Sequence, residues 1–301
     1  MASIREGTVE GFKAKIVRMG DLIIGIPVEI GPRILYLAHK DDSDINLFGV
    51  IPEFAIDTPE GKWKIYGGHR LWVSPEAMPR SYSLDDKPVD VRIRGGEVVI
   101  EGNPEPENFI RKRITIRPRS DGNSVEVIHE IENIGRWPIE FACWAISLMK
   151  KDGFAIAPIK PKRVDERGLL PDRVITLWPY TDLKDERLIL STNYVFMRQD
   201  PKIRDPIKIG VKANPPWAAY WTSGYLFVKK IKYEEGATYP DFQSSIEIYT
   251  NNLFLELETL GPLRKIDPGE VNRHTEIWKV SKVGELEPSE EAIRRVKDIV
   301  E

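Results

Sequence analysis

The sequence first tells us what the protein is not, through the residues that it lacks. Cys143 is the only cysteine among 301 residues, which excludes an intramolecular disulfide and a metal site built from several cysteines. No apolar run is long enough to cross a bilayer, and the N-terminus lacks the apolar core of a signal peptide. We therefore expect a cytoplasmic protein.

Glutamine is also scarce, and neither sign of charge dominates. Gln199 and Gln243 are the only glutamines in a chain that is 30% charged, a combination that favours a thermophilic source. The formal net charge of -3 creates no strong field that would attract a nucleic acid or an anionic membrane. An uncharged small-molecule partner fits this balance better than either.

What the sequence does contain is a period of two in its hydrophobic residues, which predicts β-strands. Strands are expected at Asp21 to Ile30 and at Arg33 to Ala38, on either side of Gly31-Pro32. Alternating valines and isoleucines on both sides of Gly95-Gly96 predict a hairpin. The pattern predicts an all-β, antiparallel fold, and the length fits a single domain over residues 1–301.

Only one stretch predicts a helix. It covers about 290–300, where Ile293, Val296 and Val300 recur at helical spacing and Ser289 can cap the first turn. Lys160 to Asp172 mixes proline, glycine and charges, and we expect it to be a long surface loop. Loops of this length often cover binding sites.

The densest polar cluster is near the C-terminus. A strand would place Glu256 and Glu258 on one face, and a second strand would do the same for His274, Glu276 and Trp278. If the two strands are neighbours, carboxylates, an imidazole and an indole line one surface, as a sugar pocket requires. The alternative is a solvated sheet face with ion pairs.

A second cluster follows the paired glycines Gly67-Gly68. Glycine allows close approach or a positive φ there, and His69, Arg70, Trp72 and Glu76 crowd into the next eight residues. Arg70 is suited to donating paired hydrogen bonds to vicinal sugar hydroxyls, and His69 to exchanging a proton near neutral pH. The alternative is a structural turn in which Arg70 pairs with Glu76 or another carboxylate.

Aromatic residues in predicted loops form a third feature, at Trp178-Pro179-Tyr180, Pro215-Pro216-Trp217 and Tyr239-Pro240-Asp241. Sugar rings have apolar C–H faces that stack on indoles and phenols, so exposed aromatics beside polar groups are typical of carbohydrate sites. Any one of them alone is more often a residue that packs in a core or a lid. His129, on an otherwise apolar strand face, is predicted to be a buried histidine with its hydrogen bonds satisfied.

These segments carry a resemblance to a known family. Ile246-Glu247-Ile248-Tyr249-Thr250-Asn251-Asn252, followed by Leu257-Glu258-Thr259, resembles the C-terminal motif of aldose 1-epimerases, and Gly67-Gly68-His69-Arg70-Leu71-Trp72 resembles their Gly-Gly segment. The likeness is closer to an uncharacterised branch of the galactose mutarotase-like superfamily. It implies an antiparallel β-supersandwich with a sugar cleft on one concave face, and Glu258 in the position of the catalytic base.

The sequence departs from that family at the general acid. Where the epimerases carry a histidine, this chain has Phe141-Ala142-Cys143-Trp144-Ala145, and an indole does not donate a proton to a ring oxygen. We therefore take His69 or His274 as the candidate acid and Glu258 as the base. The candidate substrate-binding residues are Arg70, Trp72, Glu76, Trp144, Trp217, Tyr239, Asp241, Glu247 and Glu256.

Two classes of function fit these residues. One is a sugar-active enzyme of the aldose 1-epimerase type with a rearranged general acid, and the other is a non-catalytic sugar-binding or sensing protein. A histidine that reaches the cleft opposite Glu258 would favour the enzyme. A third alternative is a calcium site formed by Glu247, Glu256 and Glu258, but carboxylates spaced along strands bind metal less often than they bind counter-ions, so no cofactor or metal is expected. The identity of the sugar, its phosphorylation and the oligomeric state stay open.

Overall fold

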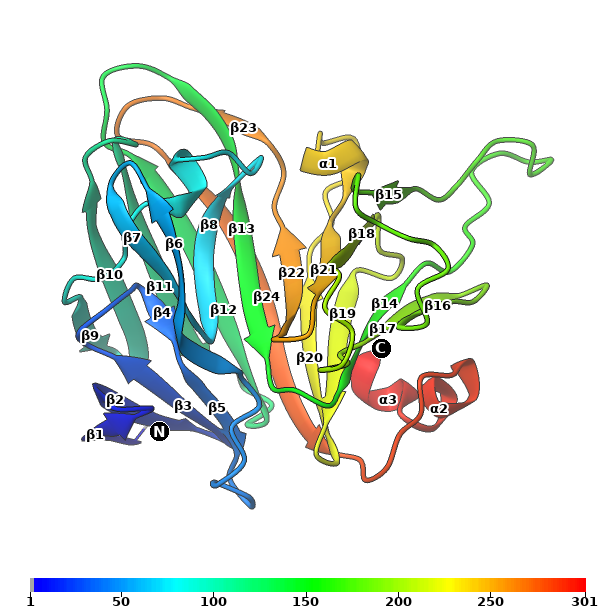
Figure 1. The fold of residues 1–301 in the computed structure, drawn as a ribbon, viewed down its shortest axis with the longest axis horizontal. Helices are drawn as coiled ribbons and strands as arrows, with labels where there is room; N and C mark the ends of the chain where they lie inside the picture. Colours follow the sequence, from blue (N-terminus) through cyan, green and yellow to red (C-terminus); the bar gives the residue numbers. More distant parts are fainter. Residues whose placement is uncertain (1–2) are drawn as a thin grey trace.

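Two large antiparallel sheets dominate the computed structural model, which describes residues 3–301 (Figure 1). The larger sheet has ten strands. In spatial order they are β16 (Leu188–Leu190), β17 (Tyr194–Arg198), β14 (Phe154–Pro158), β19 (Trp217–Thr222), β20 (Tyr225–Ile231), β24 (Val271–Lys282), β12 (Ser124–Asn133), β11 (Ile110–Pro118), β10 (Glu97–Glu105) and β9 (Asp90–Arg94). The predicted hairpin at Gly95-Gly96 is confirmed as the β9–β10 turn.

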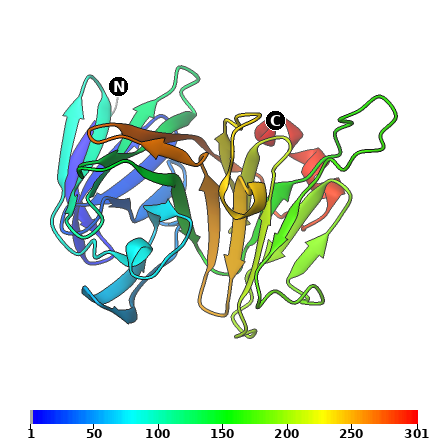
Figure 2. The same cartoon turned by 90° about the horizontal axis from the view of Figure 1, so that it is seen from above.

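The second sheet has eight strands and carries the features of interest for function. Its order is β15 (Ile175–Leu177), β18 (Ile207–Val211), β21 (Ile246–Thr250), β22 (Leu255–Leu260), β13 (Ile139–Met149), β8 (His69–Ser74) and β4 (Arg33–Ile34), with β23 (Arg264–Ile266) paired to β13. Figure 2 shows the two sheets from above, with β21 and β22 near the middle of the molecule. The prediction of an all-β antiparallel sandwich is confirmed.

Two smaller sheets and four short helices complete the fold. Four strands form one sheet, β1 (Ser3–Val9), β2 (Phe12–Met19), β3 (Leu22–Pro27) and β5 (Tyr36–His39), and two form a hairpin, β6 (Val50–Thr58) and β7 (Gly61–Gly67). The helices are the 3-10 turn η1 (Arg80–Tyr82), α1 (Pro240–Gln243), α2 (Glu290–Arg295) and α3 (Lys297–Val300). Among the described residues no helix has the length and apolar character needed to span a membrane.

Two sequence-based boundaries need correction. The expected strand from Arg33 to Ala38 is two strands in different sheets, because the chain leaves the eight-stranded sheet after Ile34 and joins β3 from Tyr36 onwards. The expected helix at 290–300 is α2 and α3, separated at Val296, whose backbone lies outside the helical region. Ser289 does cap α2, accepting a hydrogen bond from Ala292 N. The apolar side of both helices packs on the ten-stranded sheet.

The core lies between the large sheets, and alternation along each strand decides which side chains enter it. On β8, Leu71 and Val73 point into the core with His69, whereas Arg70 and Trp72 project from the opposite face. The same alternation on β22 sends Leu255 and Leu257 inward and Glu256 and Glu258 outward. The outward face of the eight-stranded sheet therefore collects polar and aromatic groups.

The bend that leads into β8 depends on two glycines. Gly67 and Gly68 both have positive φ, and a Cβ on them would lie 2.2 Å from Gly49 O and 2.1 Å from Ile34 O. The fully buried Arg33 holds this bend from the other side by donating to the carbonyl oxygens of Ile65 (2.9 Å) and Gly67 (2.8 Å). The start of β8, and with it the register of Arg70 and Trp72, is thus tightly defined.

Candidate functional site

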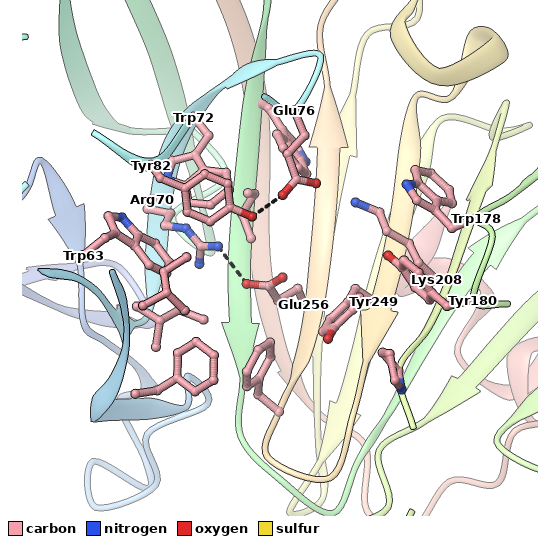
Figure 3. Close-up of a pocket in the computed structure, with 17 residues that line it drawn as sticks. Trp63, Arg70, Trp72, Glu76, Tyr82, Trp178, Tyr180, Lys208, Tyr249 and Glu256 are labelled. Carbon is pink, nitrogen blue, oxygen red and sulfur yellow. Dashed lines mark hydrogen bonds and ion pairs between the residues drawn. The ribbon is translucent and has the colours of Figure 1, made fainter. Parts of the chain in front are cut away.

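The outward face of the eight-stranded sheet forms the floor of a cavity of about 370 Å³. Strand pairing places Trp144 opposite Trp72, and Ile146 opposite Arg70, where β13 meets β8. On the other side of β13, Glu256 and Glu258 occupy every second position of β22 and therefore lie on the same face. Tyr249 on β21 and Lys208 on β18 continue this face, and Figure 3 shows the labelled side chains converging on one space.

Aromatic side chains make up most of the cavity walls. One wall comes from the β6–β7 hairpin and the turn that follows β8, and the other from the loop after β15 (Figure 3). The aromatic residues that line it are Phe54, Trp63, Trp72, Tyr82, Trp144, Trp178, Tyr180, Tyr249 and Phe254. Trp72 packs edge-on against Trp63 and Trp144, with ring centroids 5.3 and 5.5 Å away. Such packing fixes ring orientation and preforms the cavity.

Four charged side chains line the cavity, namely Arg70, Lys208, Glu76 and Glu256. Each of the two cations is already paired with a carboxylate. Arg70 Nη2 donates to Glu256 Oε1 at 2.8 Å, and its guanidinium lies over Trp72, 4.5 Å from the ring centroid. Burial, opposed by Arg70, raises the pKa of Glu256. Glu76 accepts a hydrogen bond from the hydroxyl of Tyr82.

Lys208 is held between two carboxylates that lie beneath the cavity. Its Nζ is 2.7 Å from Glu247 Oε2 and 2.9 Å from Glu258 Oε2, and it lies 4.6 and 4.7 Å from the ring centroids of Trp144 and Trp178. Burial acts to lower the pKa of Lys208, but the two carboxylates outweigh it and raise the pKa well above its usual value. Lys208 is therefore a permanent cation in the floor of the site.

A second hollow of about 350 Å³ adjoins the first. The two share Glu76, Tyr82, Trp144, Trp178 and Lys208, and the second adds Met78 and Asp241. Together they form a continuous cleft whose volume lies in the usual range of small-molecule sites.

The predicted histidines lie elsewhere, in the layer between the two large sheets. His69 and Arg70 are consecutive on a strand, so their side chains must point to opposite faces, and it is Arg70 that faces the cavity. His274 is on β24 in the ten-stranded sheet and contacts Thr259 from the core side. The expectation that His69 or His274 reaches the cavity does not hold, and no histidine lines it among the described residues.

These histidines belong to a fully buried polar network. His129 Nδ1 donates to His274 O (3.2 Å), so His129 Nε2 is free to accept from His69 Nε2 (2.7 Å), whose Nδ1 accepts from Ser147 Oγ (2.9 Å). Neutral imidazoles therefore satisfy all three of these hydrogen bonds. Burial, opposed by Glu276, lowers the pKa of His129 to about 4 and that of His274 to about 3.

Glu276 is the anion at the centre of this network. Lys229 Nζ lies 2.8 Å from Glu276 Oε1, while Thr259 Oγ1 (2.5 Å) and Trp278 Nε1 (2.6 Å) also donate to the carboxylate. His69, His129 and Glu276 each offer one possible metal-ligand atom, and these atoms lie within 4.8 Å of one another, close enough to hold a metal ion. Because Lys229 already neutralises Glu276, the arrangement fits an internal ion pair better than a metal centre.

The other predicted residues divide into three groups. Arg70, Trp72, Glu76, Trp144 and Glu256 line the cavity, and Asp241 lines the adjoining hollow. Glu247 and Glu258 are buried directly behind Lys208, and Trp144 Nε1 donates to Glu258 Oε2 at 2.8 Å. Two aromatics lie apart from the cleft, since Trp217 is packed under the C-terminal helices and Tyr239 is stacked on Tyr233.

Several cavity residues were not among the predicted site residues. Lys208 is the most important of them, and its only signal was a lone lysine in the apolar strand Ile207–Val211. Trp178 and Tyr180 belong to the aromatic residues predicted in loops, whereas no sequence pattern marks Trp63 and Tyr82 as site residues. The long loop at 160–172 does not line the cleft, and the wall on that side is formed by residues 178–180 instead.

Comparison with solved structures identifies the fold. A protein from Salmonella typhimurium provisionally described as a mutarotase superposes with a TM-score of 0.59 over 93% of this chain and 94% of its own, at 9% identity. A galactose mutarotase-like protein from Lactobacillus casei gives 0.52 over 93% and 100%, also at 9% identity. This chain has the galactose mutarotase-like fold.

The fold also occurs as part of a larger protein. A TPR-domain containing protein from Parabacteroides distasonis matches 90% of this chain with a TM-score of 0.58 at 12% identity, and the chain spans about half (47%) of its length. No protein-family model matches the chain, and no curated protein is similar enough in sequence to match. The likeness is therefore one of three-dimensional structure.

Proposed function

We propose that this protein binds a carbohydrate in the cleft over the eight-stranded sheet. The observation that carries the proposal is the composition of the cavity, which combines packed aromatic rings with the Arg70–Glu256 pair and Glu76 in about 370 Å³. Indole and phenol faces stack on the apolar faces of sugar rings, while charged groups bond their hydroxyls. The galactose mutarotase-like fold of the chain supports the same ligand class.

The charges of the cleft favour an uncharged sugar. Arg70 is neutralised by Glu256, and Lys208 is neutralised by Glu247 and Glu258, so neither cation has an unbalanced charge that would attract a phosphate or carboxylate. Arg70 Nε and Nη1 have no hydrogen-bond partner among the described residues and remain able to donate to sugar hydroxyls. Glu76 is bonded only to a tyrosine hydroxyl among the described residues and would repel an anion. We expect neutral mono- or oligosaccharides to bind, and their phosphorylated or acidic forms to bind more weakly.

Removal of Trp178 tests the binding proposal. The side chain is partly exposed in a loop, so Trp178→Ala should fold normally while losing the stacking surface. A loss of about 1.5 kcal/mol would weaken sugar affinity roughly 10-fold. Isothermal calorimetry against a panel of neutral sugars, their 6-phosphates and uronic acids measures affinity and charge preference together.

Trp137→Ala is the matched control, because Trp137 is 77% exposed and lies outside the cleft. It should leave sugar affinity unchanged. If no sugar binds the native protein, or if the two variants bind equally well, the cleft is not a carbohydrate site.

A second candidate is anomeric exchange of the bound sugar, with Glu258 as the base as the family resemblance implies. Glu258 Oε1 has no hydrogen-bond partner among the described residues, so it retains an acceptor position for a sugar hydroxyl once Lys208 and Trp144 move aside. Glu258 would take the proton of the anomeric hydroxyl, while the fraction of Glu256 that is protonated, which burial increases by raising its pKa, would give a proton to the ring oxygen as the bond from C1 to that oxygen breaks. The open aldehyde then recloses on either face.

Two-dimensional exchange NMR on α- and β-aldoses distinguishes catalysis from binding. For an epimerase, we expect Glu258→Gln to reduce the exchange rate by at least 100-fold while sugar affinity falls much less. Exchange at the uncatalysed rate in the native protein, together with measurable sugar binding, would leave the binding function and reject the catalytic one.

A further inference from the structure

The cleft over the eight-stranded sheet consists of two hollows. The first, of about 370 Å³, lies over Arg70 and Trp72, and the second, of about 350 Å³, reaches Met78 and Asp241. Trp144 lines both of them. Each hollow alone has the volume of a small-molecule site, since such sites begin at about 300 Å³. A single sugar ring would therefore leave one hollow empty.

The second hollow has the same kind of lining as the first. The indoles of Trp144 and Trp178 belong to both hollows. The carboxylate of Glu76 accepts a hydrogen bond only from a tyrosine hydroxyl, and that of Asp241 has no hydrogen-bond or ion-pair partner within residues 3–301. Both carboxylates can therefore accept hydrogen bonds from sugar hydroxyls beside an aromatic surface, as the first hollow does with Glu256.

A strained turn forms the outer edge of the second hollow. Within α1, Asp241, Phe242 and Gln243 all have positive φ, of 49°, 56° and 74°. Residues with a side chain adopt this region only at a cost in free energy, so three in succession need support from their surroundings. That support is present, because Asp241 O accepts hydrogen bonds from Thr176 Oγ1 (2.9 Å) and Ser244 Oγ (2.7 Å). The turn is thereby fixed to β15 and to the start of β21.

The turn presents the ring of Phe242 to solvent. This side chain is 82% exposed, more than any other large hydrophobic residue in the described part of the chain. Because Phe242 directly follows Asp241, which lines the second hollow with Trp178, it stands next to that hollow. Figure 3 shows the coil of α1 above Trp178. A strained backbone that exposes an aromatic ring adds nothing to the core, and strain of this kind is concentrated at ligand-binding sites.

We propose that the ligand is a chain of at least two sugar units, with one unit in each hollow and the ring of Phe242 as a stacking surface for the outer unit. This inference rests on the proposed carbohydrate function and narrows it to disaccharides and longer chains. The linkage between the two units lies near Trp144 and Trp178, which belong to both hollows. Glu76 and Asp241 accept hydrogen bonds from the hydroxyls of the outer unit.

Isothermal calorimetry with matched sugars tests the length of the ligand. Glucose is compared with maltose and cellobiose, galactose with lactose, and mannose with β-1,4-mannobiose. At least one disaccharide should bind about 10-fold more tightly than either of its monosaccharides, because only the disaccharide fills both hollows. If monosaccharides bind and no disaccharide binds more tightly, the inference fails while the proposed function stands. If no sugar binds at all, both fail.

Phe242→Gly tests the outer contact separately. Glycine adopts a positive φ without strain, so the variant should fold as the native protein does. It should lower the affinity for the disaccharide roughly 5-fold and that for the monosaccharides much less. Phe109→Gly is the matched control, because Phe109 also has a positive φ (54°), is 60% exposed and lies outside both hollows. Equal disaccharide affinity of the two variants would contradict the role of Phe242.

Discussion

Lowering the pH from 6.5 towards 4 is expected to destabilise the protein steeply. The buried histidines His69, His129 and His274 are neutral in the folded state, because burial lowers the pKa of each, to about 4 for His129 and about 3 for His274. In the unfolded chain the same groups titrate near pH 6.5. Below that pH the unfolded state binds more protons than the folded state.

The sign of the effect follows from this difference. The free energy of unfolding falls as pH falls wherever the unfolded state holds more protons. Three protons, each worth about 1.4 kcal/mol per pH unit, give the histidines a slope of up to roughly 4 kcal/mol per unit between about pH 6 and pH 4. The raised pKa values of Glu247 and Glu256 offset part of this slope, because these carboxyls take up protons in the folded state first. The loss begins at the unfolded-state pKa, and it slows only when His129 starts to take up a proton in the folded state.

Urea unfolding at intervals between pH 7.5 and 4.5 measures this slope. His39 lies outside the network, so His39→Gln should leave the slope unchanged. His274→Gln removes one of the three titrating groups and should reduce the slope by about one third. Equal slopes for the native protein and His274→Gln would show that the histidines are not neutral and buried as described.

Replacing Lys208 by methionine is expected to cost about 3–5 kcal/mol of stability at neutral pH. The substitution keeps the length of the side chain but leaves Glu247 and Glu258 next to each other without their shared cation. Both carboxylates are fully buried, and burial already raises the pKa of Glu247. The penalty is that of an uncompensated buried charge.

Two further variants separate this penalty from a general loss of a lysine. Lys212→Met removes a lysine from an exposed pair with Glu235, and it should change stability by less than about 1 kcal/mol. Lys208→Met/Glu247→Gln removes a negative charge together with the positive one and should recover a large part of the loss. Equal stability of the two single variants in urea would contradict the buried triad.

The strands and the floor of the cleft could be predicted largely from local sequence. Alternation placed Glu256 and Glu258 on one face, and the residues after Gly67-Gly68 do provide Arg70 and Trp72 to the cavity. The same alternation also required His69 and Arg70 to face opposite ways, so only one of them could belong to the cleft. The sequence alone did not indicate which.

The remaining features depend on long-range pairing, which periodicity does not contain. Lys208, on β18, meets Glu247 and Glu258 on the consecutive strands β21 and β22, and Glu258 lies 50 residues further along the chain. A shared surface of Glu258 and His274 required their strands to be neighbours, but β22 and β24 belong to different sheets that face each other across the core. Trp217 looked like a loop aromatic because two prolines precede it, yet it begins β19 and is buried.

The cleft has a floor and walls of different origin. The floor belongs to the eight-stranded sheet, whose other face is the core, whereas the walls come from the β6–β7 hairpin and the loop at 178–180. The breadth of ligand that the protein accepts can therefore be re-engineered by lengthening or shortening this hairpin at its tip, between Asp57 and Lys62. Changes at the tip would leave in place the carbonyl groups of Ile65 and Gly67 that Arg33 holds, and with them the register of β8.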